Sequence, residues 1–257
     1  MALLLVVGSA LLSGQWLYET QRARQLAQRI TAESGIEIGY GEPASFWVEP
    51  YTAEDALAPG LAMQAVDTHS ALIAMDGIEA ALQQYPRGFV SRFVSAIFIC
   101  GELRMGGARA GGTAAPAWII LAAPPDIGDE AIRLTAYLGV HHELSSYVLR
   151  QDASTMETWA AFAPRAARFV PEANAALARQ NDPEPDPAEG FLSAYGATNA
   201  ENDFNVYAEK IFSEPQDVLD LARRYPLVER KLDFVLATYA ALDPRLQDTF
   251  HKLGFER

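Results

Sequence analysis

Residues 139–150, with the sequence GVHHELSSYVLR, combine side chains that could hold a metal ion and move a proton. In a His-Glu-x-x-His helix, two histidines one turn apart bind zinc and the glutamate acts on the metal-bound water. His142 and Glu143 fill the first two positions, but Ser146 stands where the second histidine would be. The segment is therefore a metal site with altered ligands, a former metal site, or a helix whose polar residues only hydrogen-bond to one another.

Apolar runs and helical periodicity predict the elements that position these residues. Short apolar runs predict strands over residues 36–41, 93–100 and 117–124. The glycine-rich residues 101–116 predict a turn or hairpin. Helical spacing predicts helices over residues 18–35, 67–86 and 126–151, and one or two helical turns from residue 156 to Pro164. After a proline-rich loop at 180–190, it predicts helices in 200–212, in 215–242 and in a short C-terminal tail. A few strands followed by many helices indicate an α+β fold.

Composition narrows the classes of protein and partner. The 257 residues are 50% hydrophobic and 21% charged, which is typical of a folded globular protein. The formal net charge of −13 disfavours binding to nucleic acid or to anionic lipid. The single cysteine, Cys100, lies in an apolar run, so neither an intrachain disulfide nor a cysteine-based zinc cluster is expected.

The N-terminal segment resembles the apolar core of a signal peptide. Residues 1–16 are apolar with small residues toward their end, and they are too few for a comfortable membrane span. No positive charge precedes this core, and the first ones, Arg22 and Arg24, follow it. We predict a signal peptide, anchor or helix over residues 1–30 and one main domain over 31–257. Export is favoured, with membrane contact only through this segment, and the alternative is a buried N-terminal helix.

Several landmarks along the chain occur in the order found in a known family. They are IEAALQQYPRGFV, AIFICGELRMGGARAGGTA, AWIILAA, the His-Glu helix and GFLSAYGATNAENDFNVYAEKIF. Together they span residues 78–212, about half the chain, and this order resembles a family of bacterial zinc-binding metallopeptidases. The layout is also similar to the catalytic domain of anthrax lethal factor, as an analogy of fold only. The resemblance implies an α+β, zincin-like domain with zinc as cofactor and a peptide or protein as substrate.

The resemblance also implies roles for individual residues. His142 would be the first zinc ligand, and Glu143 the general base that takes a proton from metal-bound water. Glu209 would be the ligand from a second helix. Tyr195 or Tyr207 would stabilise the oxyanion that forms when water attacks a peptide carbonyl.

Ser146 departs from the family pattern, because a neutral serine is a poor zinc ligand and catalytic sites use three protein ligands plus water. A third donor would have to come from Asp203, from His141, or from the remote His69 or His251. We therefore expect a zinc-dependent peptidase outside the cytoplasm, with a non-catalytic peptide-binding or cell-envelope-binding descendant as the alternative. A metal-free hydrolase that uses Glu143 and a histidine is a third reading.

Each of these residues also has a structural interpretation. The His-His-Glu segment could be a hydrogen-bonded cluster between two helices. Asp203 could be an acid of a helix N-terminus, capped by Thr198 or Asn199. Glu209 with Lys210 could form a solvated helix face.

Overall fold

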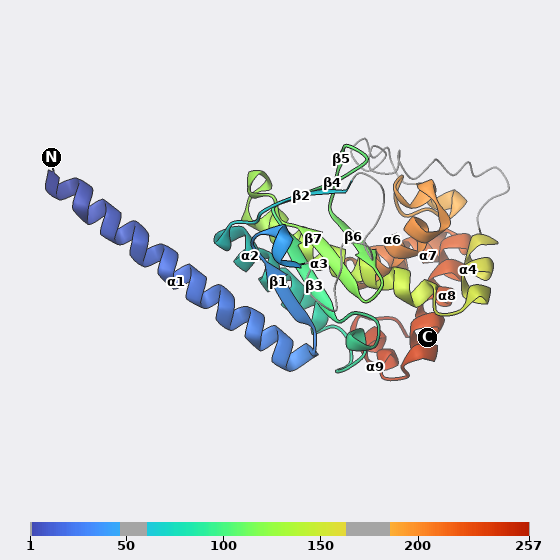
Figure 1. Cartoon of the computed structure of the whole chain (residues 1–257). Coiled ribbons are helices and arrows are strands. Elements are labelled where there is room, and N and C mark those ends of the chain that lie inside the picture. The colour runs from blue at the N-terminus through green and yellow to red at the C-terminus, as the bar shows by residue number, and fades with distance from the viewer. Residues whose placement is uncertain (1, 47–60, 163–185, 257) are drawn as a thin grey trace.

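The computed structural model describes residues 2–46, 61–162 and 186–256, with side chains from residue 17 onward. Helices dominate, and the strands form two small sheets that precede most of the helices (Figure 1). The predicted α+β class is confirmed at this level.

The main sheet has the strand order β1-β3-β7-β6. Its strands are β1 Glu37–Tyr40, β3 Ala96–Cys100, β7 Trp118–Ala122 and β6 Gly112–Ala115. The first three are parallel, and β6 runs antiparallel to β7 at the end of the sheet. Every residue of β3 and β7 is buried, which explains why both appear as continuous apolar runs in the sequence.

The two faces of this sheet are covered by different partners. Ile97, Ile99 and Leu121 point to the face that packs on the helices. Phe98 and Ile120 alternate with them and pack on the other face, together with the small sheet. That small antiparallel sheet has the order β2-β4-β5, with β2 Ala62–Gln64, β4 Glu102–Met105 and β5 Ala108–Ala110. The predicted glycine-rich hairpin is therefore confirmed as β4–β5, whereas β2 was not predicted.

Helices α2 and α3 cover the sheet and pack closely on each other. Their bounds are α2 Thr68–Leu82 and α3 Asp129–Leu149. Gly77 permits this approach, because a Cβ there would lie 2.2 Å from the carbonyl oxygen of Arg133. The packing fixes α3, which carries the His-Glu segment, between the sheet and the C-terminal helices.

The C-terminal part packs on the other side of α3 (Figure 1). It contains α4 Ala153–Ala160, α6 Ala200–Ser213, α7 Pro215–Arg224, α8 Pro226–Leu242 and α9 Leu246–Lys252. The predicted helical segment over residues 215–242 forms two helices, because Pro226 cannot donate the backbone hydrogen bond that would continue α7.

The N-terminal segment belongs to one continuous helix, α1 Ala2–Ser34. Its C-terminal part packs on α2 and β1 through Leu26 and Ile30, and it ends before Gly35, whose φ is 77°. The predicted amphipathic character and end are confirmed. The N-terminal half projects away from the body of the molecule (Figure 1). Within the described residues, no helix is both long and apolar enough to cross a membrane.

Candidate functional site

Helices α3 and α6 bring His142 and Glu209 into direct contact. His142 Nδ1 pairs with Glu209 Oε1, although the two residues are 67 positions apart in the chain. Both side chains are largely buried, with exposed fractions of 7% and 12%. The predicted convergence of these two residues is thus observed. Because Glu209 holds Nδ1, the other ring nitrogen of His142 is left to act on a ligand or an ion.

Ser146 lies one turn beyond His142 and is held by a hydrogen-bond network. Asn205 on α6 donates from Nδ2 to Ser146 Oγ over 2.9 Å. The Asn205 Oδ1 atom lies 2.5 Å from Ser145 Oγ, which is also 2.6 Å from the His142 carbonyl oxygen. These three side chains are buried. The position that a second histidine ligand would occupy is therefore filled by a satisfied polar network.

Glu143 lies on the face of α3 that approaches the edge strand β6. A Cβ built on Gly112 would lie 3.0 Å from Glu143 Oε1, so glycine allows the carboxylate to sit close above this strand. Glu143 also raises the pKa of Tyr147, although burial of the Tyr147 hydroxyl is the larger cause. The predicted general base therefore lies close to β6, and it is the neighbour in sequence of His142.

Of the two candidate tyrosines, Tyr195 lies beside the pair and Tyr207 does not. The Tyr195 ring lies 5.6 Å from the His142 ring, centroid to centroid. Tyr207 is fully buried and donates to the carbonyl oxygen of Gly190 over 3.0 Å. The geometry thus leaves Tyr195 as the tyrosine that could contact a ligand at His142.

Asp203 is occupied by a different partner. Its Oδ2 atom pairs with Lys231 Nζ at 2.7 Å, and both side chains are buried. Burial raises the pKa of Asp203 to about 7, and the neighbouring ammonium of Lys231 limits the rise. The ammonium also donates to the Gly190 carbonyl oxygen over 2.9 Å and lies over the Phe191 ring at 4.5 Å. This ion pair anchors the segment that leads to Tyr195.

These donors do not complete a three-ligand metal site. In the part of the chain that the structure describes, no three His, Cys, Asp or Glu side chains could hold one ion. His142 and Glu209 meet, but Asp203 faces Lys231 and Ser146 is bonded to Asn205. A catalytic zinc site uses three protein ligands plus water, and the residues present do not fit that requirement.

The other suggested third donors lie elsewhere. His69 is exposed and pairs with Asp129 at 3.1 Å, and His251 is exposed on α9. His141 is fully buried, bonded through Nδ1 to Tyr85 Oη at 2.7 Å and stacked on Phe212. His141 is therefore a core residue that fixes α3.

Burial of His141 predicts a loss of stability in acid. Burial lowers the pKa of His141 to about 3, from 6.5 in the unfolded chain. Because the unfolded state binds the proton more readily, stability falls as pH drops from 6.5 toward 3. This group should remove roughly 2 kcal/mol between pH 7 and pH 5. Urea unfolding of the parent and of His141→Phe at pH 7 and pH 5 measures this loss in the free energy of unfolding. The parent should lose roughly 2 kcal/mol more than the variant between the two pH values. Equal losses would contradict the burial of a neutral His141.

Sequence reasoning missed the residues that support the site. Asn205 and Lys231 had no predicted role, and Gly112 was predicted only as part of a turn or hairpin, since each acts through a contact made in the folded chain. Asn205 had one weak signal: it lies one turn before Glu209, on the same face of a predicted helix.

Comparison with known proteins gives no match to any family model, curated protein or solved structure. The resemblance to zinc metallopeptidases therefore remains a prediction from the sequence.

Proposed function

We propose that this chain is a zincin-like protein that binds an extended peptide along the outer edge of β6, without zinc-dependent cleavage. The observation that carries the proposal is the position of this edge. The strand ends the main sheet among the described residues, and Glu143 lies close to it. The next residue back along α3, His142, pairs with Glu209.

The ladder between β6 and β7 identifies the backbone groups that a peptide would use. The Ala122 N–H donates to the Gly111 carbonyl, so Gly111 faces β7. Backbone groups alternate along an antiparallel strand, so Thr113 also faces β7 while Gly112 and Ala114 direct theirs outward. An extended peptide can add to such an edge through main-chain hydrogen bonds.

The network around Ser146 supports binding rather than cleavage. In a zinc site of this type, residue 146 would supply a third ligand. Here it is Ser146, whose buried hydroxyl accepts a hydrogen bond from Asn205. The orientation of His142 is fixed by Glu209, and the Tyr195 ring lies beside the His142 ring. These groups offer a peptide hydrogen bonds and a ring surface.

We predict that Ala114→Pro abolishes peptide binding. Proline removes an outward N–H, whereas the ladder bonds of β6 to β7 are made by its neighbours. Peptides are first selected from a synthetic library of extended sequences by their retention on the immobilised protein. Fluorescence anisotropy then measures their binding to each variant. They should bind the parent and the matched control Ala114→Gly, but not Ala114→Pro. Equal binding to all three proteins would contradict use of this edge, and circular dichroism would verify that the variants fold.

A second candidate is a zinc-dependent peptidase with an altered metal site. It is favoured by the contact between His142 and Glu209, which are the two ligands that the resemblance implies. With two protein ligands, zinc binding should be weak. The same library, incubated with zinc, distinguishes the candidates by mass spectrometry. Intact peptides support binding alone, whereas fragments that disappear in Glu143→Gln establish the peptidase.

We also propose that the protein acts outside the cytoplasm, because residues 1–16 resemble the apolar core of a signal peptide. N-terminal sequencing of the protein made by its host tests this placement. A first residue beyond this segment in an exported fraction supports it, and recovery from the cytoplasm with Met1 retained contradicts it.

A further inference from the structure

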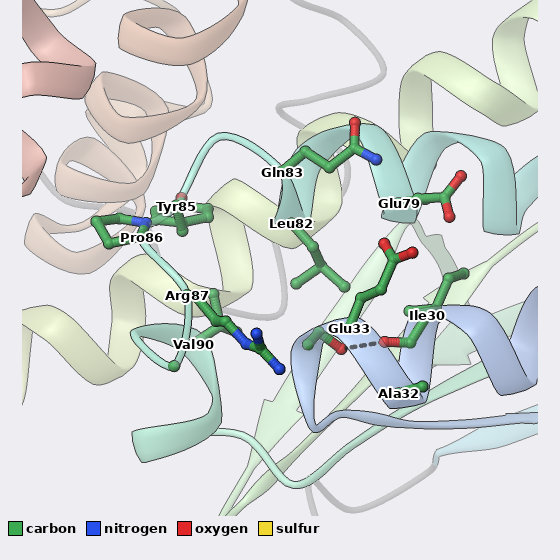
Figure 2. Close-up of a pocket in the computed structure, with 12 residues that line it drawn as sticks. Ile30, Ala32, Glu33, Glu79, Leu82, Gln83, Tyr85, Pro86, Arg87 and Val90 are labelled. Atoms are coloured by element: carbon green, nitrogen blue, oxygen red, sulfur yellow. Dashed lines mark hydrogen bonds between the residues drawn. The ribbon is translucent and has the colours of Figure 1, made fainter.

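A cavity of about 360 Å³ lies at the place where α1 and α2 both end. Its walls are the last turns of these helices and the loop from Tyr85 to Gly88, with Val90 beyond it (Figure 2). This volume is within the range of small-molecule binding sites, about 300–1,000 Å³. The cavity is separate from the β6 edge, and its function does not depend on the proposal above.

The floor of the cavity is apolar. Ile30 from α1, Leu82 from α2 and Val90 are buried residues that line it, and the buried Tyr85 lines it as well. A ligand that fills this space would bury an aliphatic group of its own against them.

One side of the rim is acidic. Glu33 is an exposed residue in the last turn of α1, and Figure 2 shows its side chain extending toward Leu82. Neither α1 nor α2 carries a basic residue in its own last turn, so neither helix offsets the negative end of its dipole with a side chain of its own. Glu79, which also lines the cavity, is already paired with Arg29 through two bonds of 2.8 Å. The charge of Glu33 also acts on Arg29, but no ion pair within 4 Å joins the two residues among those described, so Glu33 is the carboxylate that remains to meet a second cation.

The other side of the rim carries a positive charge. Arg87 extends from the loop toward the end of α1 (Figure 2). Arg87 and Glu33 line one cavity, yet no ion pair within 4 Å joins them, and within the described residues neither has another such partner. Two opposite charges held apart across an apolar floor match a ligand that carries both charges.

We infer that this cavity binds a small zwitterion with an aliphatic side chain, of amino-acid or dipeptide size. Its carboxylate would accept hydrogen bonds from the Arg87 guanidinium, and its ammonium would meet Glu33 at the end of α1. The aliphatic side chain would rest on Ile30, Leu82 and Val90.

Calorimetric titration of the full chain tests this assignment with four probes: L-leucine, the dipeptide Leu-Leu, isocaproate and isoamylamine. Each single-charge probe should bind about tenfold more weakly than the better zwitterion, because it loses one charged hydrogen-bond contact. The ratio of the two zwitterion affinities shows whether the free amino acid or the dipeptide is the better occupant.

Two variants and one control assign the contacts. Arg87→Gln should weaken binding of the zwitterion and of isocaproate but not of isoamylamine. Glu33→Gln should weaken binding of the zwitterion and of isoamylamine but not of isocaproate. Arg223→Gln, at an exposed position on α7, should leave all four affinities unchanged. The inference is overturned if neither zwitterion binds at millimolar concentration, or if isocaproate or isoamylamine binds as tightly as the better zwitterion. It is also overturned if Arg87→Gln and Glu33→Gln both bind all four probes like the parent.

Discussion

Ser146→His is expected to raise the affinity of the protein for zinc by on the order of a hundredfold, or about 2.7 kcal/mol. His142 and Glu209 already meet in one buried place. Residue 146 lies one helical turn from His142 on the same face, so an imidazole there would join the pair. The donor set would then match the three ligands of a catalytic zinc site.

The new histidine must displace the buried hydrogen bond between Ser146 and Asn205, so the control variants alter that network separately. Asn205 donates to Ser146 and would lose its acceptor, so the double variant Ser146→His/Asn205→Ala gives the imidazole more room. Ser146→Ala removes the hydroxyl without adding a ligand, and Ser146→His/Glu209→Gln removes the partner ligand.

Zinc per chain after dialysis, together with competition against a chromophoric chelator, measures the effect. We expect about one ion per chain in Ser146→His, and well below one in the parent and in both controls. Unchanged affinity in the single and double histidine variants would show that α3 and α6 do not form a zincin-type arrangement.

Lys231→Met is expected to destabilise the protein by about 3–5 kcal/mol. The substitution leaves the Asp203 carboxylate buried without its counter-charge, and it removes a donor from the Gly190 carbonyl oxygen. The aromatic rings around Lys231 Nζ offer a methionine side chain an apolar site, so the main loss is electrostatic.

A double variant separates the ion pair from general packing effects. Asp203→Asn/Lys231→Met removes both charges and should recover most of the stability, because replacing a whole buried pair is often close to neutral. Urea unfolding gives the free energies, and Lys252→Met, at an exposed position, is the matched control. A loss below about 1 kcal/mol for Lys231→Met, the range of an exposed pair, would contradict the buried ion pair.

The sequence predicted the elements that have strong local patterns. The buried strands β3 and β7 and helices α2, α3 and α6 follow from apolar runs and periodicity within each segment. The exposed three-residue strand β2 has no such pattern, because its pairing with β4 is set by the fold. The helical segment 215–242 was predicted without an internal boundary, and the structure divides it at Pro226.

Only the part of the site that belongs to a sequence motif was predictable. His142 and Glu209 were paired through the family resemblance, and the structure brings them together. Asp203 was considered as a metal ligand or as an acid of a helix N-terminus. It lies in the first turn of α6 but pairs with Lys231, a contact across 28 residues that no local pattern could indicate.

Amide hydrogen exchange of β6, with and without a peptide selected on the protein, tests the central claim most directly. The outward amides of Gly112 and Ala114 should exchange quickly in the free protein and slowly in the complex, and the peptide should be recovered intact. Protection confined to other segments, or a peptide cut in a Glu143-dependent reaction, would contradict the account.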